Sequence, residues 1–141
     1  MSVRVAKSAG FCFGVSRAVE LVQQAAAAGK RTLTLGPIIH NRHVVEQFAA
    51  AGVRVIDRPE EAGPGDTVVI RSHGVSREVY KRLESTGAEI IDATCPFVKR
   101  IHGLVSQAEA EGRLPVIIGT PTHPEVEGIA GWCGDCRIFD S

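Results

Sequence analysis

The strongest constraint on the fold of this chain is the alternation of short apolar runs with longer stretches of helical periodicity. Six runs have the length and apolar content of buried strands: residues 3–6, 32–35, 53–56, 67–71, 89–92 and 114–118. Stretches with apolar residues at helical spacing lie between several of them: residues 15–26, 44–51, 77–86 and 98–111. A helix between two strands returns the chain to the same end of the sheet. This order therefore predicts an α/β fold of βα repeats with parallel sheets.

Glycines mark the expected ends of these helices. Gly29 is the expected C-cap of the first helix, and Gly52, Gly87 and Gly112 follow the other three. Glycine readily takes the left-handed backbone conformation with which many helices end. Residues 59–66, which include two prolines and two glycines, are expected to form a loop without a helix.

The chain has 141 residues, enough for one small domain and the beginning of another. Five of the predicted strands precede Cys95 and suffice for one sheet. We therefore predict a first α/β domain at residues 1–95 that carries Cys12 and Cys95, and the start of a second α/β domain at residues 96–141. A strand that only begins at residues 137–140 indicates that this second domain is truncated.

Composition excludes several classes of partner. Sixteen basic residues balance sixteen acidic ones, so no net positive field favours nucleic acid or an anionic membrane. The first 13 residues hold no apolar run of signal-peptide length, and no 18 consecutive residues are apolar. We expect a cytoplasmic protein without membrane or nucleic-acid partners. In that reducing compartment its four cysteines should be thiols or metal ligands.

Reactive side chains follow the predicted strands: Cys12, His40, His73, Cys95 and His123 come after the first, second, fourth, fifth and sixth strand. In a parallel α/β sheet these loops share one edge, where ligands bind. Two thiols and three imidazoles should therefore face a common cleft. Cys12 lies between glycines at a helix entrance, and Cys95 precedes a proline suited to a first helical turn. A helix N-terminus favours the thiolate at both places.

The three loop histidines suit an anion. His40, His73 and His123 precede expected helix N-termini, where protonated rings and free backbone N–H groups would both favour the oxygens of a diphosphate. Glu125 is the carboxylate beside this group, and it either complements the helix dipole or delivers protons in a dry cleft. His43 and His102 lie in or beside predicted helices and are expected at the surface.

Two alternatives come from other motifs. Trp132-Cys133-Gly134-Asp135-Cys136 resembles a thioredoxin-type dithiol, but only five residues follow it and they read as a strand rather than a long helix. A zinc site on Cys133 and Cys136 lacks a second ligand pair, so exposed spectator thiols are the simplest expectation. A Rossmann-type nucleotide binder lacks support because no Gly-x-Gly-x-x-Gly follows any strand.

Five loop segments together resemble the LytB-type 4-hydroxy-3-methylbut-2-enyl diphosphate reductases. The matching segments are GFCFGV at 10–15, GPIIHN at 36–41, RSHG at 71–74, DATCP at 92–96 and HPEV at 123–126. The family's usual GDPNHPE run is GTPTHPE here, at residues 119–125, and it keeps the histidine and the glutamate. The resemblance implies that this chain is the N-terminal part of a three-domain, trefoil-like reductase.

The resemblance also implies a cofactor. Family members hold a [4Fe-4S] cluster with three cysteines, two of which match Cys12 and Cys95. The third is expected in a later part of the family's chain, because Cys133 and Cys136 come too early and in another context. The 141-residue piece is therefore expected to lack the third ligand and to be inactive alone.

The implied reaction is the last step of the non-mevalonate isoprenoid pathway. It converts 4-hydroxy-3-methylbut-2-enyl diphosphate to isopentenyl and dimethylallyl diphosphate by two-electron reductive dehydroxylation. A ferredoxin or flavodoxin would donate the electrons. By resemblance, His40, His73 and His123 would grip the diphosphate, and Glu125 would supply protons with help from His123.

Overall fold

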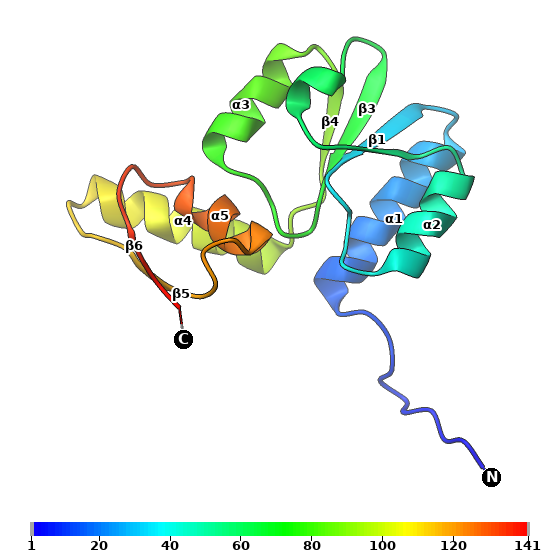
Figure 1. Ribbon diagram of the computed structural model, residues 1–141, viewed down its shortest axis with the longest axis horizontal. Helices are drawn as coiled ribbons and strands as arrows, with labels where there is room; N and C mark the ends of the chain where they lie inside the picture. The colour runs from blue at the N-terminus through cyan, green and yellow to red at the C-terminus, as the bar shows by residue number, and fades with distance from the viewer. Residues whose placement is uncertain (1, 141) are drawn as a thin grey trace.

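A four-stranded parallel sheet forms the centre of the protein in a computed structural model that describes residues 2–140. Its strands are β1 (Arg31–Leu35), β2 (Arg54–Ile56), β3 (Asp66–Ile70) and β4 (Glu89–Asp92), in the order β2-β1-β3-β4. Figure 1 shows this sheet in the upper part of the molecule. The predicted parallel α/β class is confirmed.

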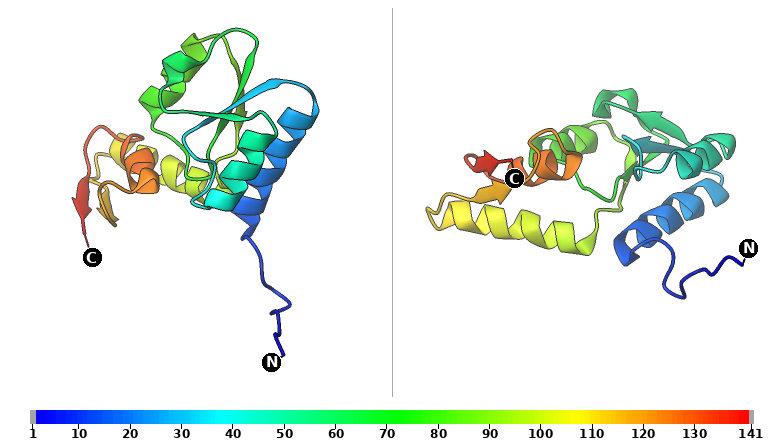
Figure 2. Two further views of the ribbon diagram at one scale, coloured as in Figure 1. Left: turned by 45° about the vertical axis from the view of Figure 1, so that its right-hand side comes forward. Right: turned by 60° about the horizontal axis from the view of Figure 1, so that its bottom comes forward.

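Helices cover both faces of the sheet. The helices α1 (Phe13–Ala27) and α2 (Arg42–Ala50) pack on one face, where Val69 of β3 points. The helix α3 (Arg77–Ser85) packs on the other face, against Val68 and Ile70. Neighbouring side chains of β3 thus enter opposite cores, and all five of its residues are buried. The left view of Figure 2 shows α1 and α2 side by side.

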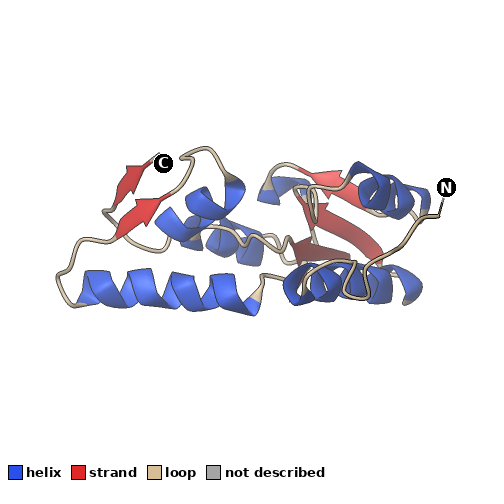
Figure 3. Cartoon of the chain, turned by 90° about the horizontal axis from the view of Figure 1, so that it is seen from below, coloured by secondary structure: helices blue, strands red, loops and turns tan. Residues whose placement is uncertain are grey.

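Residues 96–140 form a second, smaller lobe beside the sheet. It holds the long helix α4 (Pro96–Ala110), the short helix α5 (Pro124–Ala130) and two strands, β5 (Val116–Ile118) and β6 (Arg137–Phe139). The strands pair in parallel as a separate sheet, and Figure 3 shows this lobe next to the first. The run at 114–118 was predicted to be buried, but Val116 and Ile118 are exposed. We propose that the domain boundary lies at residues 95–96, where the chain leaves the larger sheet.

The structure corrects the prediction at the N-terminus. Residues 3–6 form no strand, and the side chains of Val3 and Val5 are 89% and 79% exposed. A short apolar run forms a strand only where it pairs with a neighbour, and residues 3–6 pair with neither β2 nor β4, the edge strands of the larger sheet. Cys12 therefore follows an exposed, extended segment instead of a strand.

Helix ends agree with the glycine pattern. Gly29, Gly52, Gly87 and Gly112 have φ values of 72°, 84°, 74° and 69°, which confirms their predicted positions just after helices. Among residues 2–140, no helix combines the length and apolar character that crossing a membrane demands.

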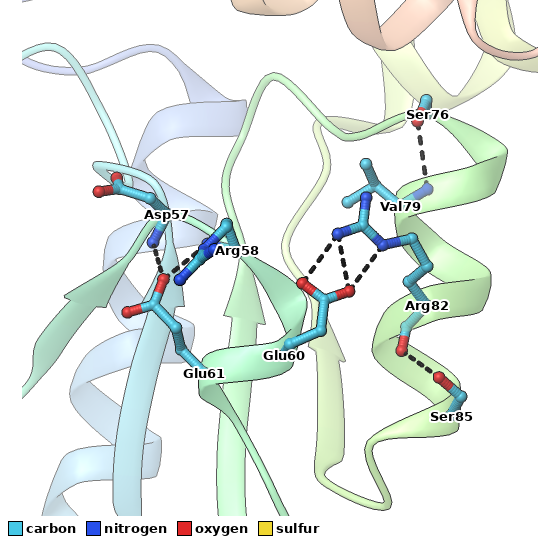
Figure 4. A network of polar contacts seen from close by, with 8 residues as sticks. All are labelled: Asp57, Arg58, Glu60, Glu61, Ser76, Val79, Arg82 and Ser85. Carbon is cyan, nitrogen blue, oxygen red and sulfur yellow. Dashed lines mark hydrogen bonds and ion pairs between the residues drawn. The ribbon is translucent and has the colours of Figure 1, made fainter.

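A short 3-10 helix, η1 (Pro59–Glu61), replaces part of the loop expected at residues 59–66. Figure 4 shows how polar contacts attach it to α3. The Arg82 guanidinium donates to both oxygens of Glu60 at 2.7 and 2.8 Å, and Glu61 accepts from the backbone N–H of Asp57 at 3.0 Å. Ser76 caps α3 through its hydroxyl oxygen. The Glu60–Arg82 contact thereby attaches η1 to the last turn of α3.

Candidate functional site

The order of the strands creates a crevice at the carboxyl ends of β1 and β3. The chain leaves β1 through α2 to reach β2 on one side, and it leaves β3 through α3 to reach β4 on the other. Because α2 and α3 cover opposite faces, the loops after β1 and β3 diverge at this point. Ligands of open α/β sheets bind at such a switch point.

Three imidazoles meet at this crevice. His40 lies in the loop after β1, His73 in the loop after β3, and His123 is the N-cap of α5. The ring centroids are 4.8 Å apart for His40 and His73, 5.7 Å for His73 and His123, and 6.0 Å for His40 and His123. The structure thus brings together the three histidines that the sequence placed in one cleft.

A hollow of about 290 Å³ opens beside two of these rings. Its lining includes His40, His73 and Asn41, and also Phe11 and Val15 from the segment around Cys12. Asn41 caps α2 by accepting from the N–H of Val44. The hollow therefore lies between the histidines and the start of α1.

The surroundings of His73 keep its ring uncharged at neutral pH. Burial, followed by the nearby His40, Arg71 and His123, lowers the pKa of His73 from 6.5 to about 4. Its Nδ1 atom is buried and has no hydrogen-bond partner within residues 2–140. The expected protonated ring at His73 therefore requires a nearby negative charge. A bound anion would reverse the effect, because negative charge favours the imidazolium.

Arg71 places a partly buried cation beside the same crevice. Its Nη1 atom lies so close to Gly36 that a Cβ added to this glycine would stand 2.6 Å from it. Gly36, which ends β1, has a φ of 71°. Burial lowers the pKa of Arg71, and Glu127 opposes that shift. Sequence reasoning did not single out Arg71, although it belongs to the RSHG segment.

Cys12 and Cys95 occupy equivalent positions at helix starts. Cys12 is the N-cap of α1 and Cys95 the N-cap of α4, and neither thiol makes a capping hydrogen bond. The Cys95 Sγ atom lies against Gly14 in the first turn of α1, where an added Cβ would be 2.6 Å from the sulfur. The start of α1 therefore packs directly on the second cysteine, and both thiols are free to act as ligands.

Ser72, which sequence reasoning also missed, joins three of the site's loops. Its buried hydroxyl donates to the Ile38 carbonyl at 3.3 Å, in the loop that carries His40. Its own carbonyl accepts from the backbone N–H of Cys95 at 2.9 Å. The histidine loops and the start of α4 are thereby held in one arrangement.

Glu125 lies in the first turn of α5, as predicted. Its backbone N–H donates to Nδ1 of His123 at 3.2 Å. The neutral His123 ring therefore carries its proton on Nε2. The Glu125 side chain is partly exposed and stands within one helical turn of that imidazole.

Cys133 and Cys136 lie away from this site. The Gly134 N–H donates to Glu109 near the far end of α4, 14 positions from Cys95 and so about 21 Å along the helix. Burial and the neighbouring Cys136 raise the pKa of Cys133 to about 11, so its thiol is protonated and a poor ligand. Both thiols are partly buried, not exposed as expected.

The thiol geometry suits a cluster only in part. Within residues 2–140, no group of three His, Cys, Asp or Glu side chains is arranged to hold a metal ion. Cys12 and Cys95 have the chemistry of two cluster ligands. A cluster with three cysteine ligands would need a third thiolate from outside the described residues.

The two remaining histidines differ from each other. His43 is exposed on α2, with a contact of 3.1 Å to Gln47, and this confirms its predicted surface position. His102 was predicted at the surface, but its exposed fraction is only 4%. The ring is enclosed because it faces Trp132 and Gly74 instead of solvent.

Fold and site together define a parallel α/β protein that presents three imidazoles at the carboxyl ends of its strands, with two cysteines at the N-cap positions of nearby helices. The family model described as LytB protein matches residues 3–141. The chain belongs to the LytB family.

Named relatives agree with this family. The chain is 47% identical over 139 residues to the 4-hydroxy-3-methylbut-2-enyl diphosphate reductase of Caldanaerobacter subterraneus subsp. tengcongensis, a match that covers 96% of this chain and 48% of the relative. It is 46% identical to the reductase of Citrifermentans bemidjiense, with 99% and 49% covered. The chain thus spans about half the length of the curated relatives it matches.

Solved structures show the same relation. A structure of (E)-4-hydroxy-3-methyl-but-2-enyl diphosphate reductase, described as the terminal enzyme of the non-mevalonate pathway, superposes with a TM-score of 0.82 at 42% identity. That match covers 97% of this chain and 50% of the other. The Plasmodium falciparum reductase superposes with a TM-score of 0.88 at 27% identity, covering 96% and 42%.

Proposed function

We propose that this chain forms part of an iron–sulfur reductase that converts 4-hydroxy-3-methylbut-2-enyl diphosphate to isopentenyl and dimethylallyl diphosphate. The observation that carries the proposal is the group of three imidazoles, with centroids no more than 6.0 Å apart, at the edge where Cys12 and Cys95 cap two helices. The names of the relatives support the same substrate and a reduction of it.

In this proposal the histidine group binds the diphosphate. His40, His73 and His123 offer ring N–H donors from three separate loops, and the cation of Arg71 lies next to His73. Binding a dianion raises the pKa of His73 and converts it to a charged donor. His73 therefore gains its positive charge when the ligand binds.

Cys12 and Cys95 would hold a [4Fe-4S] cluster, with the third thiolate supplied from outside residues 2–140. When bound, the cluster supplies electrons one at a time and an open iron that acts as a Lewis acid. Gly14 leaves room for the Cys95 sulfur beside the start of α1. The chain alone is therefore expected to bind the cluster poorly and to be inactive.

Glu125 and His123 would manage the protons. The substrate's carbon–oxygen bond breaks, its hydroxyl leaves as water with one proton, and two electrons with a second proton complete the product. Glu125 would deliver these protons, and the Nε2–H of His123 would orient a neighbouring oxygen. A ferredoxin or flavodoxin in the cytoplasm would provide the electrons.

Oxygen-free reconstitution of the full-length protein tests the proposal. The Cys12→Ser variant should lose the visible sulfur-to-iron absorption band and the reductase activity, whereas Cys133→Ser, a matched control away from the site, should retain both. The assignment fails if Cys12→Ser keeps its cluster and its activity.

A further inference from the structure

An aromatic stack joins the second lobe to the loop that carries His73. The buried His102 ring of α4 lies parallel to the Trp132 ring, with centroids 5.1 Å apart and an interplanar angle of 14°. Trp132 follows α5, so this aromatic stack of His102 and Trp132 connects the two helices of the lobe. Neither residue has a part in the proposed chemistry.

Both rings also contact the residues that follow His73. A Cβ added to Gly74 would lie 2.7 Å from Cε1 of His102, so the imidazole packs on the backbone of that glycine. The Trp132 indole N–H donates to the Val75 carbonyl at 2.8 Å, across 57 positions of sequence. The aromatic stack thus contacts two consecutive residues of the His73 loop.

The C-terminal part of helix α5 contacts the same loop. The Arg77 N–H donates to the Gly131 carbonyl at 3.2 Å, and Gly128 lies against the carbonyl of His73, 3.4 Å from an added Cβ. The Trp132 carbonyl accepts from the Ser106 hydroxyl at 2.7 Å, which ties it to α4. Helix α5 is only seven residues long. Contacts that fix its C-terminal end therefore also fix the position of His123 at its N-terminus.

We propose that His102 and Trp132 are positioning residues that hold His123 against His73. They act through the Gly74–Val75 backbone and through α5, and they contact no ligand. The proposal concerns the geometry of the three histidines and does not depend on which anion they bind.

The surroundings of the aromatic stack make it sensitive to truncation. A hollow of about 540 Å³ borders both rings, and its lining also includes Tyr80, Thr94 and Ser106. The Arg77 guanidinium also lies over the Trp132 ring, 5.5 Å from its centroid. Loss of the His102 ring would enlarge this hollow and remove the stacking partner of the indole.

Histidine NMR titration of the intact protein provides the test. In His102→Ala, the pKa of His73 should rise from about 4 toward 6.5, by about one unit or more, as α5 moves away and water enters. His43→Ala, a matched truncation of an exposed helical histidine, should leave the pKa of His73 unchanged. His102→Phe restores a stacking ring and should return the pKa of His73 toward the original value.

Binding of inorganic pyrophosphate separates this proposal from the proposed function. His102→Ala should weaken pyrophosphate binding about tenfold if the histidines also bind phosphate. A changed pKa of His73 with unchanged affinity supports the positioning role and counts against the diphosphate site.

Two results would overturn the positioning role. One is a folded His102→Ala variant in which His73 titrates as before. If that variant does not fold, Trp132→Phe takes its place, because it keeps a ring and loses only the bond to Val75. An unchanged pKa of His73 in the folded Trp132→Phe variant would then overturn the positioning role.

Discussion

His73 shows how its surroundings set the charge of a single residue. Its position after a strand predicted a place in the site, and the structure places its ring 4.8 Å from that of His40 and 5.7 Å from that of His123. Its charge was not predictable, because burial and the proximity of Arg71 arise from folding. The neutral ring implies that the empty site has less positive charge than three protonated histidines would give.

The depressed pKa of His73 makes folding stability depend on pH. In the unfolded chain the ring binds a proton near pH 6.5, whereas in the folded protein it does so only near pH 4. The unfolded state therefore holds more protons between these values, and stability decreases as the pH falls through this window. Measured by urea unfolding, the free energy of unfolding should decrease less between pH 6.5 and pH 4 in His73→Asn than in the wild type. His43→Asn is the control, and an equal decrease in all three proteins would contradict the prediction.

Anion binding at neutral pH should take up a proton. A diphosphate stabilises the imidazolium of His73, whose pKa of about 4 leaves it neutral beforehand. Calorimetric titration of pyrophosphate at pH 7, in two buffers with different ionisation enthalpies, should give different heats that correspond to proton uptake. The uptake should be smaller in His73→Asn. Identical heats in both buffers for the wild type would show that His73 stays neutral in the complex.

At the scale of elements, the helices and central strands were largely predictable from apolar periodicity and glycines. The strand predicted at residues 3–6 is wrong because Val3 and Val5 alternate like a strand but the segment pairs with neither edge strand of the larger sheet. His102 could have been found, since it stands four residues after Val98 and three before Val105, and all three are buried. That spacing indicates the inner stripe of a helix, in which a histidine is easily overlooked.

The contact between α1 and Cys95 leads to a prediction about a glycine. Gly14→Ala adds a Cβ that would be 2.6 Å from the Cys95 sulfur, so the cysteine must move. We expect the full-length variant to fold but to hold less than half of the iron of the full-length wild type after anaerobic reconstitution. Iron and sulfide analysis measures this content.

Gly103→Ala is the matched control for that prediction. Gly103 is an exposed glycine of α4, with no atom within 4 Å of an added Cβ. It should keep the wild-type iron content and stabilise the protein by about 1 kcal/mol, because alanine favours the helix. Full iron content in Gly14→Ala would show that the cysteine adapts without loss.

At the scale of the whole molecule, the candidate site lies on the seam between the two lobes. The larger sheet and its loops supply Cys12, Cys95, His40 and His73, and α5 of the second lobe supplies His123. Local periodicity predicts each lobe separately. It does not predict how they meet, because that depends on contacts between distant residues such as the bond from Trp132 to Val75.

The second lobe also carries an uncovered apolar stripe on α4. Phe97, Ile101 and Leu104 are spaced by four and three residues, and their side chains are 70%, 37% and 53% exposed. Exposed apolar side chains in a continuous stripe favour association. The 141-residue chain should therefore self-associate reversibly at micromolar concentration. Sedimentation velocity should show several-fold weaker association for Leu104→Glu.

Charge alone also weakens association, so the comparison needs a variant with the same change in charge away from the stripe. Ala110→Glu, on another side of the same helix, adds one negative charge and leaves the three apolar residues in place. It should associate nearly as strongly as the unmodified chain. If both glutamate variants weaken association equally, net charge explains the effect and the stripe does not. Weaker association of Leu104→Glu than of Ala110→Glu would assign the contact to the apolar face of α4 that begins beside Cys95. That face would then be the surface through which the second lobe binds another chain.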